Sequence, residues 1–185
     1  MVSLNDLIKK IKNIGIYVSQ GDITQIPADV IITAINSGGM WFGGIDGAIQ
    51  RVAENHYHNQ AKEAMPLSDL QTITAKGDRE NHNGRFDNVI FVVDDLQSPL
   101  DNVIYTGLER ASLETYQKIL IPTIRMGVML GAVEKTQKEA IDRMSNGVRE
   151  FINKYSSKTN IKDLRFVVYD DFNTATQLGN SLKEI

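Results

Sequence analysis

The most informative stretch of this sequence is Asp29-Val30-Ile31-Ile32-Thr33-Ala34-Ile35, which runs directly into Asn36-Ser37-Gly38-Gly39-Met40-Trp41-Phe42-Gly43-Gly44-Ile45-Asp46-Gly47-Ala48-Ile49. The first part is almost continuously apolar and β-branched, which predicts a central strand buried on both faces. The second part is a glycine-rich loop, and residues 45–54 have the pattern of a helix. A buried strand, a glycine-rich loop and a helix in this order indicate an α/β protein.

Strand and helix patterns alternate along the rest of the chain. We expect further strands at 16–18, 70–75, 88–93, 119–121 and 164–169, and helices at 103–117, 141–155 and from about 173 onward. Strands separated by helices of ten or more residues require parallel crossovers, so we expect a layered α/β sheet. Residues 56–70 give no clear pattern.

A helix is also expected at the N-terminus, ended by Gly15. The evidence is a pair that resembles a capping box and a set of apolar residues at helical spacing: Ser3 and Asp6, then Leu4, Leu7, Ile8 and Ile11.

Composition excludes several classes of protein. With 185 residues, 42% of them hydrophobic and 23% charged, we expect one globular domain over residues 1–185. Twenty basic and 23 acidic residues give 20 − 23 = −3, which argues against nucleic acid as the main partner. The absence of cysteine excludes disulfides, thiolate zinc sites and cysteine nucleophiles.

Membrane and targeting segments are not expected either. No run reaches the ~18 consecutive apolar residues of a membrane span. Lysines at 9, 10 and 12 interrupt the apolar residues of the N-terminus, unlike a signal peptide, so we expect a cytoplasmic protein.

Ligands of open α/β sheets bind at the carboxyl ends of the strands, which directs attention to residues 22–24, 36–46, 126–131 and 169–172. In the loop after Ile35, glycines allow close backbone approach, and the following helix N-terminus favours anions without any Lys or Arg. A glycine-rich turn shaped only for packing is the alternative. Neither G-x-G-x-x-G, nor a P-loop, nor G-x-S-x-G occurs.

Four motifs taken together resemble the macrodomain family. They are Gly21-Asp22-Ile23-Thr24, Asp29 to Asn36, Gly43-Gly44-Ile45-Asp46-Gly47-Ala48-Ile49, and Ile121-Pro122-Thr123-Ile124 with Gly127-Val128, and Val167-Val168-Tyr169-Asp170 continues the likeness. The resemblance covers most of the chain in the family's order. It implies a three-layer α/β/α macrodomain-like fold with a mixed central sheet, and binding of ADP-ribose or an ADP-ribosylated protein, with no cofactor and no metal.

The resemblance also implies roles for single residues. Asp22, with Ile23 beside it, matches the carboxylate that accepts a hydrogen bond from the adenine amino group, and Tyr169 matches the aromatic near adenine. Two loops match those that bind the diphosphate and distal ribose: Ser37, Gly43, Gly44 and Ile45 in the first, and Gly127, Val128, Met129 and Leu130 in the second. Solvated or core roles are the alternatives for Asp22 and Tyr169.

Asn36 and Asp46 match the pair associated with hydrolysis in the catalytic branch of the family. The amide of Asn36 would hold the distal ribose hydroxyls, and Asp46 would orient or activate a water. A first-turn aspartate favoured by the helix dipole is the alternative for Asp46. Arg125, beside the second loop, either reaches a terminal phosphate or faces solvent.

The sequence departs from the family around the distal ribose. The family's first asparagine in the strand is Thr33, Trp41 and Phe42 replace loop glycines, and Met129 and Leu130 replace an aromatic and a glycine. We therefore expect Trp41 or Phe42 to supply the missing aromatic, and ADP-ribose recognition is better supported than hydrolysis.

Three functions remain open at this point. The first is an ADP-ribose-binding protein that hydrolyses ADP-ribosyl bonds, on proteins or in O-acetyl-ADP-ribose. The second is a non-catalytic reader. The third is a Mg²⁺-dependent phosphohydrolase, including a phosphatase for ADP-ribose 1″-phosphate, built on the acidic pairs Asp94-Asp95 and Asp170-Asp171.

The three histidines, His56, His58 and His82, lack the spacing of a metal site on one helix face.

Overall fold

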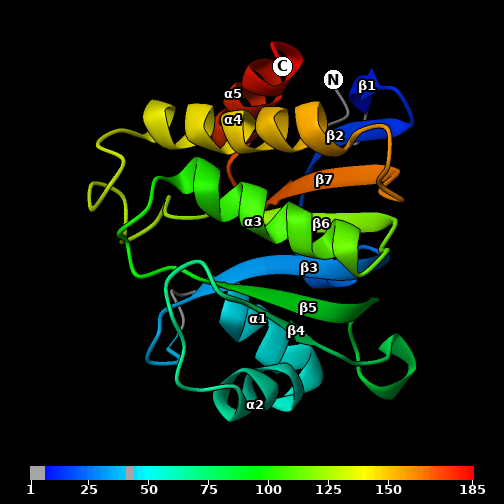
Figure 1. Cartoon of the computed structure of the whole chain (residues 1–185), viewed down its shortest axis with the longest axis vertical. Helices are drawn as coiled ribbons and strands as arrows, with labels where there is room; N and C mark the ends of the chain where they lie inside the picture. The colour runs from blue at the N-terminus through cyan, green and yellow to red at the C-terminus, as the bar shows by residue number, and fades with distance from the viewer. Residues whose placement is uncertain (1–6, 41–43) are drawn as a thin grey trace.

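The computed structural model describes residues 7–40 and 44–185. Within them the chain forms a seven-stranded mixed sheet in the order β1-β2-β7-β6-β3-β5-β4, which Figure 1 shows as a stack of strands crossed by helices. Strands β2, β7, β6, β3 and β5 run parallel, whereas β1 and β4 are antiparallel to their neighbours. The elements are β1 (Leu7–Ile11), β2 (Ile14–Gln20), the 3-10 helix η1 (Ile23–Gln25), β3 (Ala28–Ile35), α1 (Gly44–Ala53), α2 (His56–Glu63), β4 (Thr72–Ala75), the 3-10 helix η2 (Arg79–Asn81), β5 (Phe86–Val93), α3 (Leu100–Leu113), β6 (Lys118–Pro122), α4 (Gln137–Tyr155), β7 (Asp163–Val168) and α5 (Phe172–Lys183).

Helices cover both faces of the sheet, which makes three layers and confirms the expected architecture. Successive residues of β3 point to opposite faces, so Val30 and Ile32 belong to the core under α3, α4 and α5, whereas Ile31 and Ile35 belong to the core under α1 and α2. All four side chains are completely buried. The almost continuous apolar run is therefore explained by a strand that needs apolar groups on both sides.

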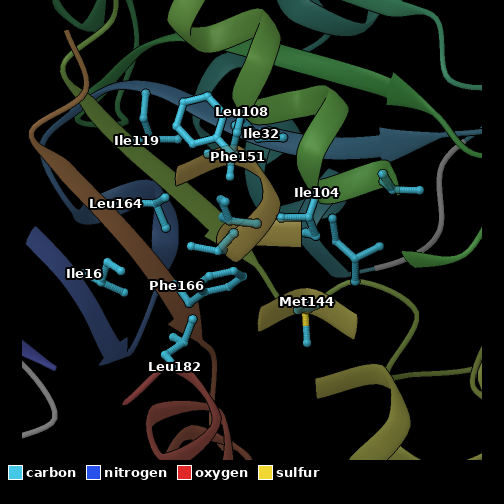
Figure 2. Packing of buried hydrophobic residues seen from close by; sticks show 14 of the residues in the cluster. Ile16, Ile32, Ile104, Leu108, Ile119, Met144, Phe151, Leu164, Phe166 and Leu182 are labelled. Atoms are coloured by element: carbon cyan, nitrogen blue, oxygen red, sulfur yellow. The ribbon is translucent and has the colours of Figure 1, made fainter. Parts of the chain in front are cut away.

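The face that carries α3 and α4 is closely packed. Phe151 of α4 and Leu108 of α3 lie beside Ile32 and Ile119 in Figure 2, and all four belong to one buried cluster. Two helix glycines allow the close approach. A Cβ at Gly107 would lie 2.5 Å from Ile32, and one at Gly147 would lie 2.6 Å from the carbonyl oxygen of Asp101.

The predicted N-terminal helix is wrong for the described residues. Leu7–Ile11 forms β1, which pairs with β2 in a hairpin that places Ile11 opposite Ile14. Lys12, in the turn, has a φ of 52°, a value that suits the tight turn of a hairpin. Pairing with β2 and packing of Ile8 against α5 outweigh the helical spacing of the apolar residues. The residues of the proposed capping box lie outside the described part of the chain.

Smaller differences concern the ends of elements. The helix expected at 103–117 is α3, which begins at Leu100 and ends at Leu113, and Tyr169 follows β7 instead of ending it. Residues 56–63, which gave no clear pattern, form α2. Among the described helices, none combines the length and apolar character that crossing a membrane requires.

Candidate functional site

The carboxyl ends of the parallel strands meet at one edge of the sheet, at the left of Figure 1. Strands β3 and β6 are neighbours there, but the chain after β3 leads to α1 on one face, and the chain after β6 leads to α4 on the other. Diverging connections of this kind open a crevice between two strands. A cleft lies at this point, lined by Thr33, Ala34, Ile45 and residues 122–129.

The expected binding residues follow one another along this edge. Asp22 lies after β2, Tyr169 after β7, the loop 126–131 after β6, and Asn36 after β3, in the order of the strands in the sheet. Three strand spacings separate the first from the last, or ~14 Å. Groups spread along a line in this way suit an elongated ligand.

At the β2 end, Asp22 shapes the chain and keeps one oxygen available. It is the N-cap of η1, and its Oδ1 accepts hydrogen bonds from the N–H of Thr24 at 2.9 Å and from its hydroxyl at 2.7 Å. Within the described residues no donor binds Oδ2, and the side chain is only half-buried. Asp22 can therefore accept a hydrogen bond from a ligand without giving up its cap.

The neighbours of Asp22 differ in exposure. Ile23 is buried, 6% exposed, and packs in the core beneath the site. Tyr169 is 77% exposed, which leaves its ring free to stack on a flat ligand. The alternative of a core role for Tyr169 is thus excluded in this arrangement.

The first loop begins with a compact turn at Asn36. Its N–H donates to the carbonyl of Met40 at 2.9 Å, and its side-chain Oδ1 accepts from the N–H of Met40 at 2.9 Å. In the described part of the chain its Nδ2 has no acceptor, so the amide keeps a donor for a ligand. Ser37 contributes less than expected, because its N–H donates to Asp95 Oδ1 at 2.8 Å.

The rest of the first loop leads into α1. Trp41, Phe42 and Gly43 lie outside the described residues. Gly44 is exposed at the start of α1, where unpaired N–H groups and the helix dipole favour an anion, and Ile45 lines the cleft.

Asp46 is buried, at 1% exposure, in the first turn of α1. Its Oδ1 lies 3.1 Å from Nε2 of His58, which is completely buried on α2. The imidazole also packs on Phe91, with 5.1 Å between ring centroids. Asp46 therefore lies against α2, and it is not among the described residues that line the cleft. The contact of His58 with Asp46 could not be foreseen from the sequence, because the two residues are 12 positions apart and lie on different helices.

The second loop presents backbone donors to the cleft. Among the described residues, the consecutive N–H groups of Gly127, Val128 and Met129 donate to no other group. Val128 is 88% exposed, and Leu130 is 36% exposed. Neighbouring N–H groups that have no partner in residues 7–40 and 44–185 can bind an anion without a cationic side chain.

Arg125 lies in the lining of the cleft, but its side chain is buried and bound within the fold, so it neither faces solvent nor is free to reach a terminal phosphate, which corrects the expectation for it. Its guanidinium is 1% exposed and forms ion pairs with Asp94 at 2.7 Å and with Glu134 at 3.0 Å. It also donates to the carbonyl of Ser98 at 2.7 Å. Burial alone would lower the pKa of Arg125, but the hydrogen bonds with Asp94 and Glu134 outweigh it and raise that pKa above its ordinary value.

Three of the four aspartates considered for Mg²⁺ have other partners. Asp94 binds Arg125 through both oxygens, and Asp95 accepts from Ser37. Asp171 is the N-cap of α5 and accepts from the N–H and hydroxyl of Thr174, which lowers the pKa of Asp171. Over residues 7–40 and 44–185, no three acidic or histidine side chains gather as a metal site would need. Asp94, Asp95 and Asp171 are thus engaged within the fold, whereas Asp170 is exposed, so the structure gives the Mg²⁺-dependent phosphohydrolase no direct support.

The chain is similar to known macrodomain proteins in sequence and in structure. No family model matches it. It is 27% identical to a macro domain-containing protein of Listeria monocytogenes over 172 residues, 85% of this chain and 92% of that one. It is 60% identical to an O-acetyl-ADP-ribose deacetylase of Escherichia fergusonii, but over 38 residues, so that the match spans only 22% of the deacetylase.

A solved structure confirms the fold. A macrodomain of Trypanosoma brucei in complex with ADP-ribose superposes with a TM-score of 0.74 at 17% identity, covering 96% of this chain and 72% of that one.

Proposed function

We propose that this chain, a protein with the macrodomain fold, binds ADP-ribose along the carboxyl edge of its sheet. The observation that carries the proposal is the order of groups at that edge: a carboxylate acceptor at Asp22, an exposed ring at Tyr169, and backbone donors at residues 127–129 that have no partner among the described residues. ADP-ribose needs these in the same order, since it joins adenine, a diphosphate and a second ribose in one line.

Each part of the ligand has a partner in this proposal. Oδ2 of Asp22 accepts from the adenine amino group, and the ring of Tyr169 stacks on the base. The N–H groups of the second loop and the start of α1 bind the diphosphate. Nδ2 of Asn36 donates to a hydroxyl oxygen of the distal ribose. The ADP-ribose bound in the Trypanosoma macrodomain, which shares this fold, supports ADP-ribose as the ligand.

Binding can be followed through the single tryptophan, Trp41. We expect its fluorescence to change and saturate as ADP-ribose is added, because Trp41 belongs to the loop assigned to the distal ribose. AMP, which lacks that ribose, serves as the comparison. The proposal fails if ADP-ribose neither changes the fluorescence nor shifts the melting temperature.

Hydrolysis of an ADP-ribosyl bond is the finer proposal. The name of the Escherichia relative supports it over a short segment only. In this proposal Asn36 holds the distal ribose, and Asp46 promotes attack by a water on the bond that links the ribose to its substituent. The burial of Asp46 against His58 favours the other candidate, a reader that binds ADP-ribose and leaves the bond intact.

An assay with O-acetyl-ADP-ribose and with a mono-ADP-ribosylated protein separates the two functions. For a hydrolase, Asp46→Asn should lower turnover while ADP-ribose affinity stays the same, because the amide keeps an oxygen for His58 but has no negative charge. Asn36→Ala should lower turnover and affinity together. A wild-type protein that binds tightly and releases no product is a reader.

A further inference from the structure

Arg125 and Glu134 flank the segment 126–133, which contains the second loop. Arg125 directly precedes this segment, and Glu134 directly follows it. Nη1 of Arg125 donates to both carboxylate oxygens of Glu134 at 3.0 Å. The ion pair thus joins the two ends of the loop.

Arg125 and Glu134 also bind residues at the end of β5 and at the start of α3, which attaches both ends of the segment to the rest of the fold. Nε and Nη2 of Arg125 bind the two oxygens of Asp94, which follows β5 directly. Oε1 of Glu134 also accepts from the N–H of Leu100, the first residue of α3, at 2.8 Å. The loop is therefore tied to the end of a central strand and to the start of a helix.

Few other contacts within the described residues hold the segment 126–133: Met126 packs against the core, and Nζ of Lys135 donates to the carbonyl of Gly131 at 3.1 Å. Residues 127, 128, 130 and 131 are exposed, so they lack core packing. Its internal hydrogen bonds run from Leu130 to Gly127 and from Ala132 to Met129, and Gly131 donates to the carbonyl of Glu134 at 2.8 Å. Arg125 holds a left-handed φ of 60°, which is unfavourable for a residue with a Cβ and is kept here by its buried partners.

We propose that Arg125, Asp94 and Glu134 form a positioning cluster that aims the N–H groups of residues 127–129 at the diphosphate. This inference rests on the proposed binding of ADP-ribose. Arg125 does not touch the ligand, because its guanidinium is already engaged by two carboxylates and the Ser98 carbonyl. A planar guanidinium fits this task, since it binds two carboxylates at fixed angles, which an ammonium group cannot do.

The first test is Glu134→Gln. The cluster has one cation and two anions, −2 + 1 = −1, so the amide leaves Arg125 and Asp94 as a balanced pair and the chain is expected to fold. The amide still accepts from Leu100 but no longer pairs with Arg125 through two charged oxygens. We expect ADP-ribose affinity to fall about tenfold, which corresponds to the loss of one hydrogen bond from a loop N–H group to the diphosphate. Affinity for AMP should change much less.

The second variant is Arg125→Lys, which keeps the charge and removes the planar geometry. Arg79→Lys is its matched control, because Arg79 also binds an aspartate, Asp87, through two nitrogens and donates to a carbonyl, that of Ala28. Arg79 lies before β5, at the opposite end of the sheet. We expect Arg125→Lys, and not Arg79→Lys, to change the ratio of the two affinities.

Calorimetry of the folded protein distinguishes the outcomes. A purely structural role would lower the melting temperature or the binding stoichiometry and leave the ratio of ADP-ribose to AMP affinity as in the wild type, and this result would overturn the inference. If the wild type binds no ADP-ribose, the proposed function fails instead.

Discussion

Charged side chains at the edge of the sheet divide into those with an atom left for a ligand and those used entirely by the fold. Asp22 caps a short helix with one oxygen and keeps the other. Arg125 and Asp94 use their polar atoms on each other and on their neighbours. Residue type alone does not separate these cases, because the partners of a side chain decide what it can still bind.

His82 gives a prediction about pH. Its Nδ1 accepts from the N–H of Gly84 at 2.9 Å, and its Nε2 lies 2.8 Å from the hydroxyl of Tyr57, which donates to the carbonyl of Asp87. Both contacts suit the neutral ring. Burial lowers the pKa of His82, and nearby His56 lowers it further.

The unfolded state therefore takes up this proton first as the pH falls. The stability that the neutral ring contributes is complete above the unfolded pKa of ~6.5 and is lost as the pH falls below it. Urea unfolding between pH 7 and pH 5 should show a decreasing free energy of unfolding, with a flatter profile for His82→Gln than for the control His56→Gln. Equal profiles for the two variants would contradict the assignment.

Local structure that depends on one residue and its chain neighbours could be predicted from the sequence. The cap that Asp22 forms depends only on the turn that follows it, and the exposure of Gly127 depends only on its place in a loop. Arg125 was not predictable, because Asp94 lies 31 positions before it, and its burial depends on the packing of the α3 start. His58 was missed for the same reason, since its contact with Asp46 joins two separate helices.

At the scale of elements, apolar patterns predicted the strands well where both faces are buried. β3 is the clearest case, because a run such as Val30 to Ile32 has no competing interpretation. β1 is the opposite case. Leu7, Ile8 and Ile11 fit a helical spacing, and only the pairing with β2 and the contact with α5 make a strand the better choice.

Replacement by alanine is predicted to have opposite effects at two helix glycines, one at the contact of α3 with α4 and one in α1. Gly147→Ala should destabilise the protein by about 1–3 kcal/mol, because its Cβ would lie 2.6 Å from the carbonyl oxygen of Asp101. An alanine Cβ at Gly47 in α1 would meet no atom of the described residues within 4 Å, so Gly47→Ala should stabilise the helix by up to about 1 kcal/mol. Thermal unfolding measures both, and equal changes at the two positions would refute this account of the packing.

At the scale of the whole molecule, the net charge of −3 is compatible with a ligand that carries two phosphates. The proposed site uses backbone N–H groups and a helix start, which attract an anion locally whatever the total charge. The resemblance to macrodomains predicted an anion site made of backbone groups. The strand order at the edge of the sheet sets the order of the proposed binding groups.

Ligand binding should also stabilise the folded chain. ADP-ribose at about 100 times its Kd should add about 2.7 kcal/mol to the free energy of unfolding. For a chain of this length, the melting temperature should rise by roughly 5–10 °C in one cooperative transition. Ribose 5-phosphate at the same concentration is the control, and an equal shift with it would indicate a nonspecific anion effect.

The central claim is that Asp22 selects the adenine end of ADP-ribose. Asp22→Asn keeps an oxygen for the cap of η1 but replaces the other acceptor with a donor, and Asp78→Asn makes the same change at the cap of η2, where Asp78 accepts from Glu80 at 2.9 Å. Isothermal calorimetry should show that the wild type and Asp78→Asn bind ADP-ribose equally, and that Asp22→Asn binds about tenfold or more weakly. Equal affinity of Asp22→Asn and the wild type, or no binding by either, would contradict the claim.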